Sequence, residues 1–370
     1  MSDEFGWNAG ERLLAEVHRM LLRLAGRLPD EMLPALRALL GTGDLRYLPD
    51  AVSVATVQYA VPVTPADKEL LDRILILLDV PGDEPQLFDR VPVAEQPPAP
   101  GPFRFLPVPP EVAARAADRI PERLDLTNGE AELPLTDLPT DLAYLEDLAR
   151  ELTDQVDVRA VDYLSIEEGV RGVWRTWRLP VDGTDPGRRV YLVELDSAVP
   201  AWEVTYELQK ELTDQGERAP QVESFWTGEP LGGYHRAALA GAALLMASDN
   251  GRVRLALTGE QLTALVRAEA ARVPVEDRPA LADRLAAGVP VPGRFDPLPD
   301  LVEPGRGTVV PGGHRTDGRR VWPEALGYYL TGYGVAPPRD LLDELTGDDG
   351  SRAVDQVALF RAGLALTVGY

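Results

Sequence analysis

The sequence predicts an α+β protein of more than one domain, on three observations. Apolar residues make up 45% of the 370 residues and charged residues 26%, a composition typical of globular proteins. Helical periodicity dominates the first eighty residues, whereas strand periodicity begins at Val173. We expect an N-terminal helical bundle, a proline-rich linker, a central small β-sheet with helices on one face, and a helical C-terminal region.

Residues 1–80 are predicted to form a helical array. The first helix is indicated by apolar residues that recur with helical spacing, namely Leu13, Leu14, Val17, Met20, Leu21 and Leu24. Gly26 and Pro29 end it, and two further helices follow. The fourth helix starts at Pro65, with Thr64 as its cap. Short connections make this array a compact bundle.

The next two segments are defined by proline and by charge. Residues 81–110 contain ten prolines, which deny the backbone the donors of a helix or central strand, so we interpret them as a linker. Residues 111–170 are interpreted as an acidic helical segment, with one helix over 140–152. Within it, residues 121–170 hold fourteen acids against three arginines.

Residues 171–257 are predicted to form a small α/β domain. Two strands, 173–181 and 189–195, flank a turn-forming sequence and indicate an antiparallel hairpin. The elements expected after the hairpin are a helix through 202–212, a strand over 222–227, a buried alanine-rich helix over 230–247 and a fourth strand over 252–257.

Residues 258–370 are predicted to be mostly helical. Thr258 opens one helix and Pro323 opens another, which follows a short strand at 319–322. The other expected helices cover 279–287 and 338–345, and a last apolar segment covers 354–368.

Composition restricts the possible location and partners. The chain has no cysteine and no basic, apolar leader at its start, and its longest apolar run, residues 237–247, is about half of what a membrane-spanning helix needs. We therefore expect a cytoplasmic protein. The net charge of −23 disfavours direct binding to nucleic acid or to a membrane surface. No cofactor and no metal is predicted.

Standard catalytic templates are absent, but two segments share one pattern. Gly232-Gly233-Tyr234-His235-Arg236 and Gly312-Gly313-His314-Arg315 each place a histidine and an arginine after two glycines, and Asp317 follows the second segment. Glycines allow close backbone approach, a helix N-terminus favours an anion, and histidine with arginine can bind or protonate a phosphate. If the segments converge, an enzyme acting on a phosphorylated or nucleotide substrate is an alternative function.

Carboxylates offer a further candidate for chemistry. Glu194 and Asp196 project to one face of a predicted strand, and Glu223 on a nearby strand joins them as possible ligands of a divalent cation. Salt bridges or a solvated sheet face are the favoured interpretation of the same residues, in line with the absence of a predicted metal.

The acidic segment supports the leading hypothesis, a non-catalytic interaction module that binds a basic protein partner through a negative surface. The residues assigned to this surface are Asp141, Glu146, Asp147, Glu151, Asp154, Asp157, Asp162, Glu167 and Glu168. A scaffold or self-assembling subunit is a second alternative, and the oligomeric state stays open.

Residues 315–345 add a resemblance. The stretch Arg315 to Leu330, followed by Pro337-Pro338 and Leu341-Leu342, resembles a tail found in uncharacterised proteins of high-GC bacteria, some of them associated with toxin and immunity loci. The resemblance implies a bacterial defence or toxin-immunity setting for the interaction hypothesis. It carries no catalytic residue over to this chain.

Overall fold

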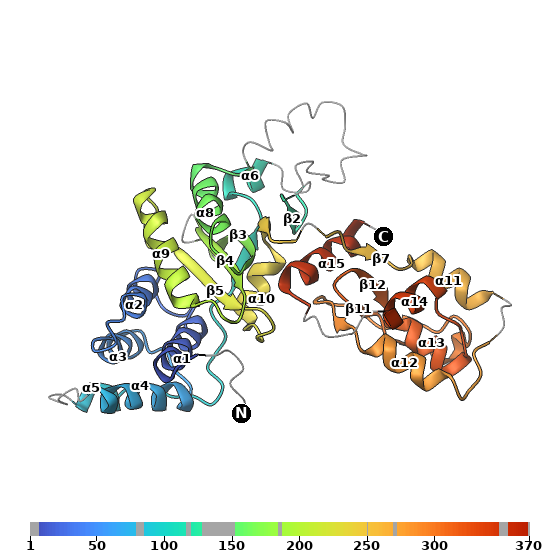
Figure 1. Cartoon of the computed structure of the whole chain (residues 1–370), viewed down its shortest axis with the longest axis horizontal. Helices are drawn as coiled ribbons and strands as arrows, with labels where there is room; N and C mark the ends of the chain where they lie inside the picture. Colours follow the sequence, from blue (N-terminus) through green and yellow to red (C-terminus); the bar gives the residue numbers. More distant parts are fainter. Residues whose placement is uncertain are drawn as a thin grey trace. The chain divides into compact units, whose positions relative to one another are not determined.

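The computed structural model contains two compact units, Met1–Ser248 and Asp249–Tyr370, which are described separately (Figure 1). The structure describes residues 7–78, 85–115, 120–127, 152–183, 187–249, 251–268, 272–347 and 354–368. Helices and mixed sheets occur together, so the predicted α+β class is confirmed. The five segments distinguished in the sequence thus group into two units. The helix predicted over 140–152 falls, except for its last residue, outside the described residues.

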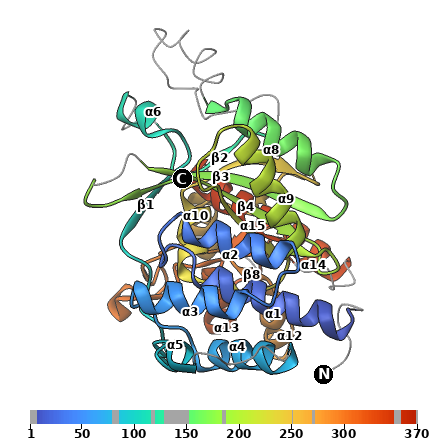
Figure 2. The same cartoon turned by 90° about the vertical axis from the view of Figure 1, so that its left-hand side faces the viewer.

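Unit 1 begins with the predicted helical array. Its helices are α1 (Ala9–Arg23), α2 (Met32–Gly41), α3 (Leu48–Gln58), α4 (Pro65–Leu77) and the short α5 (Pro85–Asp89). The side chains of Asn8 and Thr64 cap α1 and α4 in reciprocal capping boxes, which fixes where both helices start. Figure 2 shows these blue helices gathered together, and α1 and α2 contact α9 of the central region. Their buried side chains belong to one hydrophobic core that also includes the sheet.

A six-stranded mixed sheet forms the centre of unit 1. Its strands are β1 (Phe103–Leu106), β2 (Leu124–Asp125), β3 (Val170–Pro180), β4 (Arg188–Leu195), β5 (Gln221–Trp226) and β6 (Ala243–Ala247). The order is β2-β6-β3-β4-β5, and β1 pairs with the end of β3. The β3–β4 hairpin is antiparallel as predicted, whereas β5 joins β4 in parallel after the crossover helix α9 (Ala201–Asp214).

Helices lie on both faces of this sheet, whereas the sequence indicated one. Arg175 and Arg178 of β3 are three residues apart, so their side chains project to opposite faces. Arg175 pairs with Asp157 of α8 (Gln155–Ser165), and Arg178 donates to the hydroxyl of Tyr234 in α10 (Gly233–Ala240). Helix α10 therefore covers the face that α8 leaves free.

Two predicted elements differ from the structure. The helix predicted over 230–247 is two elements, because α10 ends at Gly241 and Ala243–Ala247 becomes strand β6, paired with β3. The strand predicted over 252–257 shrinks to β7 (Arg254–Leu255), which pairs with β12 in unit 2 and not with the central sheet. Strand β6 takes the place in the central sheet that was expected for β7.

The proline-rich segment is partly ordered on unit 1. Phe103–Leu106 pairs antiparallel with Trp177–Pro180, so the end of the predicted linker is an edge strand. Gly241 makes this approach possible: a Cβ added there would lie 2.4 Å from the Phe105 carbonyl oxygen. Helix α6 (Pro110–Arg115) follows directly.

Unit 2 combines helices with short strands. The helices are α11 (Gly259–Arg267), α12 (Arg278–Ala286), α13 (Ala325–Tyr333), α14 (Arg339–Gly347) and α15 (Gln356–Val368), with a 3-10 turn at Pro304–Arg306. Strands β8 (Val289–Pro290), β11 (His314–Thr316) and β12 (Arg320–Pro323) join β7 in a sheet of order β7-β12-β11-β8, and β9 (Leu298–Pro299) pairs with β10 (Thr308–Val310). Helices α11 to α14 were predicted as helices, whereas α15 was expected only as an apolar segment. Of the strands, those predicted over 252–257 and 319–322 correspond to β7 and β12.

None of the helices in the described ranges combines the length and the apolar composition required to cross a lipid bilayer.

Candidate functional site

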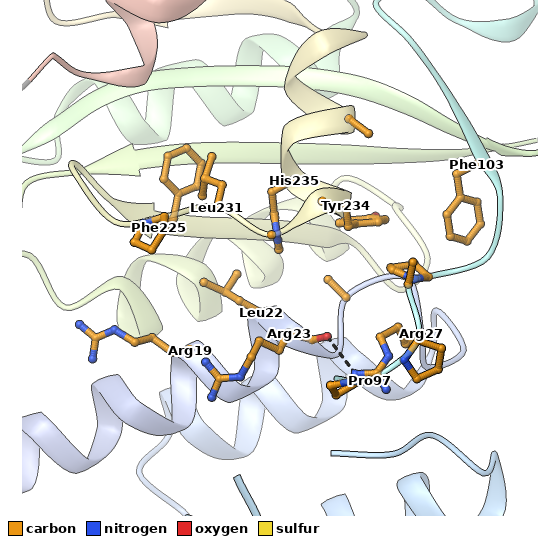
Figure 3. Close-up of a pocket in the computed structure, with 18 of the residues that line it drawn as sticks. Arg19, Leu22, Arg23, Arg27, Pro97, Phe103, Phe225, Leu231, Tyr234 and His235 are labelled. Carbon is orange, nitrogen blue, oxygen red and sulfur yellow. Dashed lines mark hydrogen bonds between the residues drawn. The ribbon is translucent and has the colours of Figure 1, made fainter. Parts of the chain in front are cut away.

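A pocket of about 820 Å³ lies within unit 1 (Figure 3). One side is formed by α1 and the turn after it, the other by the start of α10 and by β1. The segment from Pro97 to Gly101 closes a third side. Three regions that are distant in sequence, namely α1 with the turn after it, residues 97–106 and the start of α10, therefore meet around one space.

The α1 side of the pocket is cationic. Arg19, Arg23 and Arg27 follow one another at intervals of four residues, so they lie along one face of the helix and the turn that ends it. Figure 3 shows them in a row below His235 and Tyr234. Three arginines and one glutamate, Glu229, line the pocket, so its charge is positive in a chain whose net charge is −23.

The three arginines differ in their partners. Arg19 contacts both carboxylate oxygens of Glu229 through Nε, at 3.0 and 3.2 Å, and Arg23 pairs with the buried Asp67. Arg27 donates to the backbone carbonyls of Pro62 and Arg23. Burial lowers the pKa of the Arg27 guanidinium from its ordinary value, although the charge of Asp67 opposes this shift. Among the described residues, Arg27 is the pocket arginine that has no carboxylate in an ion pair.

The opposite side presents a helix N-terminus. Gly232 is the N-cap of α10, and it has no side chain that could accept a hydrogen bond from the first-turn N–H groups. Gly232, Gly233, Tyr234 and His235 all line the pocket. The positive end of the helix dipole therefore faces the same space as the arginines.

His235 connects the pocket to a buried charge network. Its Nε2 lies 3.2 Å from Glu223 Oε2, and Arg37 of α2 donates to the same oxygen. The side chains of Arg37 and Glu223 are 1% and 0% exposed. Burial opposes ionisation of Glu223, but the charge of Arg37 and the bond with His235 hold its pKa below the ordinary value. A carboxylate that orients a histidine is an arrangement suited to proton transfer, so the enzyme alternative stays a prediction for His235.

The other residues of the histidine hypothesis have structural contacts. Arg236 is exposed and donates to the Leu231 carbonyl. In unit 2, His314 packs against Phe295 with a centroid separation of 5.1 Å, and burial lowers its pKa. Arg315 pairs with Glu324, and Asp317 accepts from two backbone N–H groups of its own turn. Because His235 and His314 belong to different units, their convergence stays a prediction.

The carboxylates considered for a cation have other partners. Glu223 contacts Arg37 and His235, Glu194 accepts from the Thr227 hydroxyl at 3.0 Å, and Asp196 pairs with Arg171. The described residues contain no group of three or more histidines and carboxylates arranged to hold a metal ion.

The predicted acidic surface is only partly described. Asp141, Glu146, Asp147 and Glu151 lie outside the described residues. Asp157 is 2% exposed and contacts Arg175, Arg189 and the Tyr191 hydroxyl, so it belongs to the interior and not to a docking surface. Asp154 caps α8 and pairs with Arg189.

The remaining three carboxylates lie at or after the end of α8. Asp162 and Glu168 are exposed and Glu167 is half-buried.

Sequence reasoning missed the arginine row of α1, although its four-residue spacing was a usable signal. The contribution of Arg37 and of the proline segment carried no local signal, because both act through tertiary contacts.

Comparison with known proteins gives no relative to guide this interpretation. No protein-family model matches the chain, and no curated protein or solved structure matches it significantly.

Proposed function

We propose that unit 1 binds a small anionic ligand with a phosphate-type group in the arginine pocket. The observation that supports this proposal is the meeting of Arg19, Arg23 and Arg27 with the uncapped N-terminus of α10 around one space. Arginine forks and exposed helix N–H groups are both suited to phosphate oxygens. The proposal narrows the phosphorylated-substrate hypothesis to the first of the two Gly-Gly segments.

Charge strengthens the argument. A protein with a net charge of −23 repels anions at long range, so an anion would bind only where local cations and helix dipoles outweigh that field. The pocket has this excess, and Arg27 adds a guanidinium that forms no ion pair with a carboxylate among the described residues, although the charge of Asp67 acts on it. Arg27 donates hydrogen bonds only to neutral backbone carbonyls among the described residues. A bound anion would give this guanidinium an ion pair.

Calorimetric titration with inorganic phosphate and pyrophosphate tests the proposal. We expect binding that weakens with added salt, and the Arg27→Gln variant should bind about tenfold more weakly because one charged hydrogen-bond donor is lost. Arg12→Gln is the matched control, since Arg12 lies on α1 but outside the pocket lining. Absence of binding by the wild type, or equal affinity in the two variants, would contradict the proposal.

A second candidate function, docking of a basic protein partner, is favoured by the outer face of α8 and α9. These helices pack side by side, and burial together with Glu167, Glu207 and Glu211 raises the pKa of Tyr163 to about 12. Carboxylates from α9 and from the turn after α8 therefore gather near one hydroxyl. Ile166 is 78% exposed beside them, which offers an apolar contact within a negative surface.

Capture from native lysate tests this second candidate. The wild type should retain a basic protein at low salt, and a variant carrying Asp162→Asn, Ile166→Ser and Glu168→Gln should not. Arg27→Gln should leave this capture unchanged, because its side chain lines the pocket and not the α8–α9 face. If the triple variant retains the same proteins as the wild type, this face is not the docking surface.

A further inference from the structure

The arginine pocket has an aromatic wall in addition to its cationic one. Phe103 and Phe105 of β1 and Tyr234 of α10 all line it. Their ring centroids are 6.2 Å apart for Phe103–Tyr234, 5.4 Å for Phe105–Tyr234 and 6.4 Å for Phe103–Phe105, each with edge-to-face geometry. Phe103 and Phe105 are only half-buried, and the Arg178 guanidinium lies over the Phe103 ring at 4.8 Å from its centroid, so the ring surface open to a ligand is the part that Arg178 does not cover.

Backbone contacts hold this wall in position. Strand β1 is paired with β3 over four residues, and the close approach of Gly241 fixes the Phe105 carbonyl against the end of α10. At Gly26, where φ is +68°, an added Cβ would lie 2.6 Å from the Tyr234 ring. Larger residues do not fit at these two glycines, so the distance between the aromatic wall and α1 is set by the fold.

The size of the pocket exceeds what a simple anion needs. A volume of about 820 Å³ falls within the range of roughly 300–1,000 Å³ that is typical of small-molecule sites. Figure 3 shows the arginines in a row below Tyr234, with Arg19 at the left end and Arg27 at the end nearer to Phe103. The cationic and the aromatic side chains therefore line different sides of one space. A ligand that uses both has a charged group joined to a ring.

We infer that the pocket takes a phosphate ester with a planar aromatic body, of the nucleoside monophosphate class. This inference rests on the proposed anion binding and adds the identity of the group attached to the phosphate. The phosphate lies among the arginines and the N–H groups at the start of α10, and the ring packs on Phe103, Phe105 and Tyr234. Edge-to-face and stacked contacts favour an aromatic ring over a flexible alkyl chain of the same area.

Four probes separate the parts of this inference: inorganic phosphate, adenosine monophosphate, adenosine and decyl phosphate. By calorimetry, adenosine monophosphate should bind the wild type about tenfold or more tightly than inorganic phosphate, since ring stacking adds to the anion contacts. Phe103→Leu should remove most of this advantage and leave the affinity for inorganic phosphate unchanged, which also reports that the variant is folded. Phe88→Leu is the matched control, because Phe88 is a half-buried phenylalanine outside the pocket.

Each alternative outcome has a distinct meaning. Equal affinities for inorganic phosphate and adenosine monophosphate would overturn the aromatic inference and leave the proposed anion binding intact. Tighter binding of decyl phosphate than of adenosine monophosphate would overturn it too, in favour of an apolar tail. Adenosine binding as tightly as its monophosphate, or no binding by any probe, would overturn both proposals.

Discussion

The two Gly-Gly segments show that the same short pattern acquires different roles in the two units. In unit 1 the glycines begin a helix, and His235 lines a pocket with Glu223 behind it. In unit 2 the glycines precede strand β11, and His314 packs against Phe295. The glycines are closely approached by other atoms in unit 2 but not in unit 1. The surrounding elements then decide whether the histidine meets a pocket or a core.

The largest expected effect is on stability, and it differs between Glu223, which contacts His235 of the first Gly-Gly segment, and Glu324, which pairs with Arg315 of the second. Glu223→Gln leaves the buried Arg37 without its charge partner, and we expect a loss of about 3–5 kcal/mol in the free energy of unfolding. Glu324→Gln affects a pair with Arg315 whose side chains are 27% and 29% exposed, and should cost at most about 1 kcal/mol. Urea denaturation with hydrogen exchange at β5 and β12 measures both. Equal losses of unfolding free energy in the two variants would contradict the predicted difference between the two ion pairs.

Acid should weaken unit 1 through a third histidine, His18. Burial lowers its pKa to about 4 from 6.5, and its Nε2 lies 2.8 Å from the Ser224 carbonyl of β5. Between these pH values the unfolded chain binds a proton that the folded chain does not. The free energy of unfolding should therefore fall as the pH drops from 6.5 to 4, by up to about 3 kcal/mol.

Denaturation curves across this pH range test the assignment to His18. His18→Gln should flatten the dependence, whereas His314→Gln should leave the His18 part in place. A slope that survives in His18→Gln would show that other groups produce it.

Alanine substitution should distinguish the glycines of the two segments. A Cβ at Gly312 would lie 2.1 Å from the Asp296 carbonyl oxygen, which is backbone, so Gly312→Ala should destabilise unit 2 by about 1–3 kcal/mol. At Gly233 the nearest atom is the flexible Arg236 Nη2 at 3.9 Å, and the change should stay within about 0.5 kcal/mol. Thermal unfolding of the two variants measures this. A larger loss in Gly233→Ala would contradict the packing described at α10.

The smallest effect concerns the pocket itself. Glu229→Gln removes its one lining carboxylate and releases Arg19, so the affinity for pyrophosphate should rise about fivefold, or about 1 kcal/mol. Glu324→Gln is the control in the other unit and should not change binding. A lower affinity in Glu229→Gln would mean that Glu229 holds Arg19 in the binding position.

Local signals predicted the elements that depend on local chemistry. The caps at Thr64 and Thr258 could be identified because side chains near in sequence satisfy the backbone there, and the β3–β4 hairpin could be identified from its two strand patterns. The split of residues 230–247 could not, because alanine-rich sequence favours helix and only pairing with β3 makes Ala243–Ala247 a strand. Strands of two residues, such as β2 and β7, are too short to show any periodicity.

The candidate site was predictable to a lesser degree. The Gly232 to His235 segment could be selected from its residue types, and it does line a pocket. The acidic block was read as a surface, yet Asp157 is interior because Arg175 and Arg189 of the sheet neutralise it. Long-range ion pairs of this kind leave no mark on local sequence. For the same reason the partner of Glu223, Arg37, could not be identified in advance.

The anchoring of the proline segment has a consequence for how tightly the pocket can bind. Before the segment, Val63 exchanges backbone hydrogen bonds with Pro92 and Ala94, both at 2.9 Å, and after it β1 is fixed to β3. Pro97, Pro98 and Pro100 between these two anchors have few conformations open to them even without a ligand. A ligand that contacts residues 97–101 therefore loses little affinity to the entropy cost of ordering this segment. Replacing these prolines by glycine would weaken binding in two ways, because the free segment would gain conformational entropy and the pocket would lose the proline rings that line it.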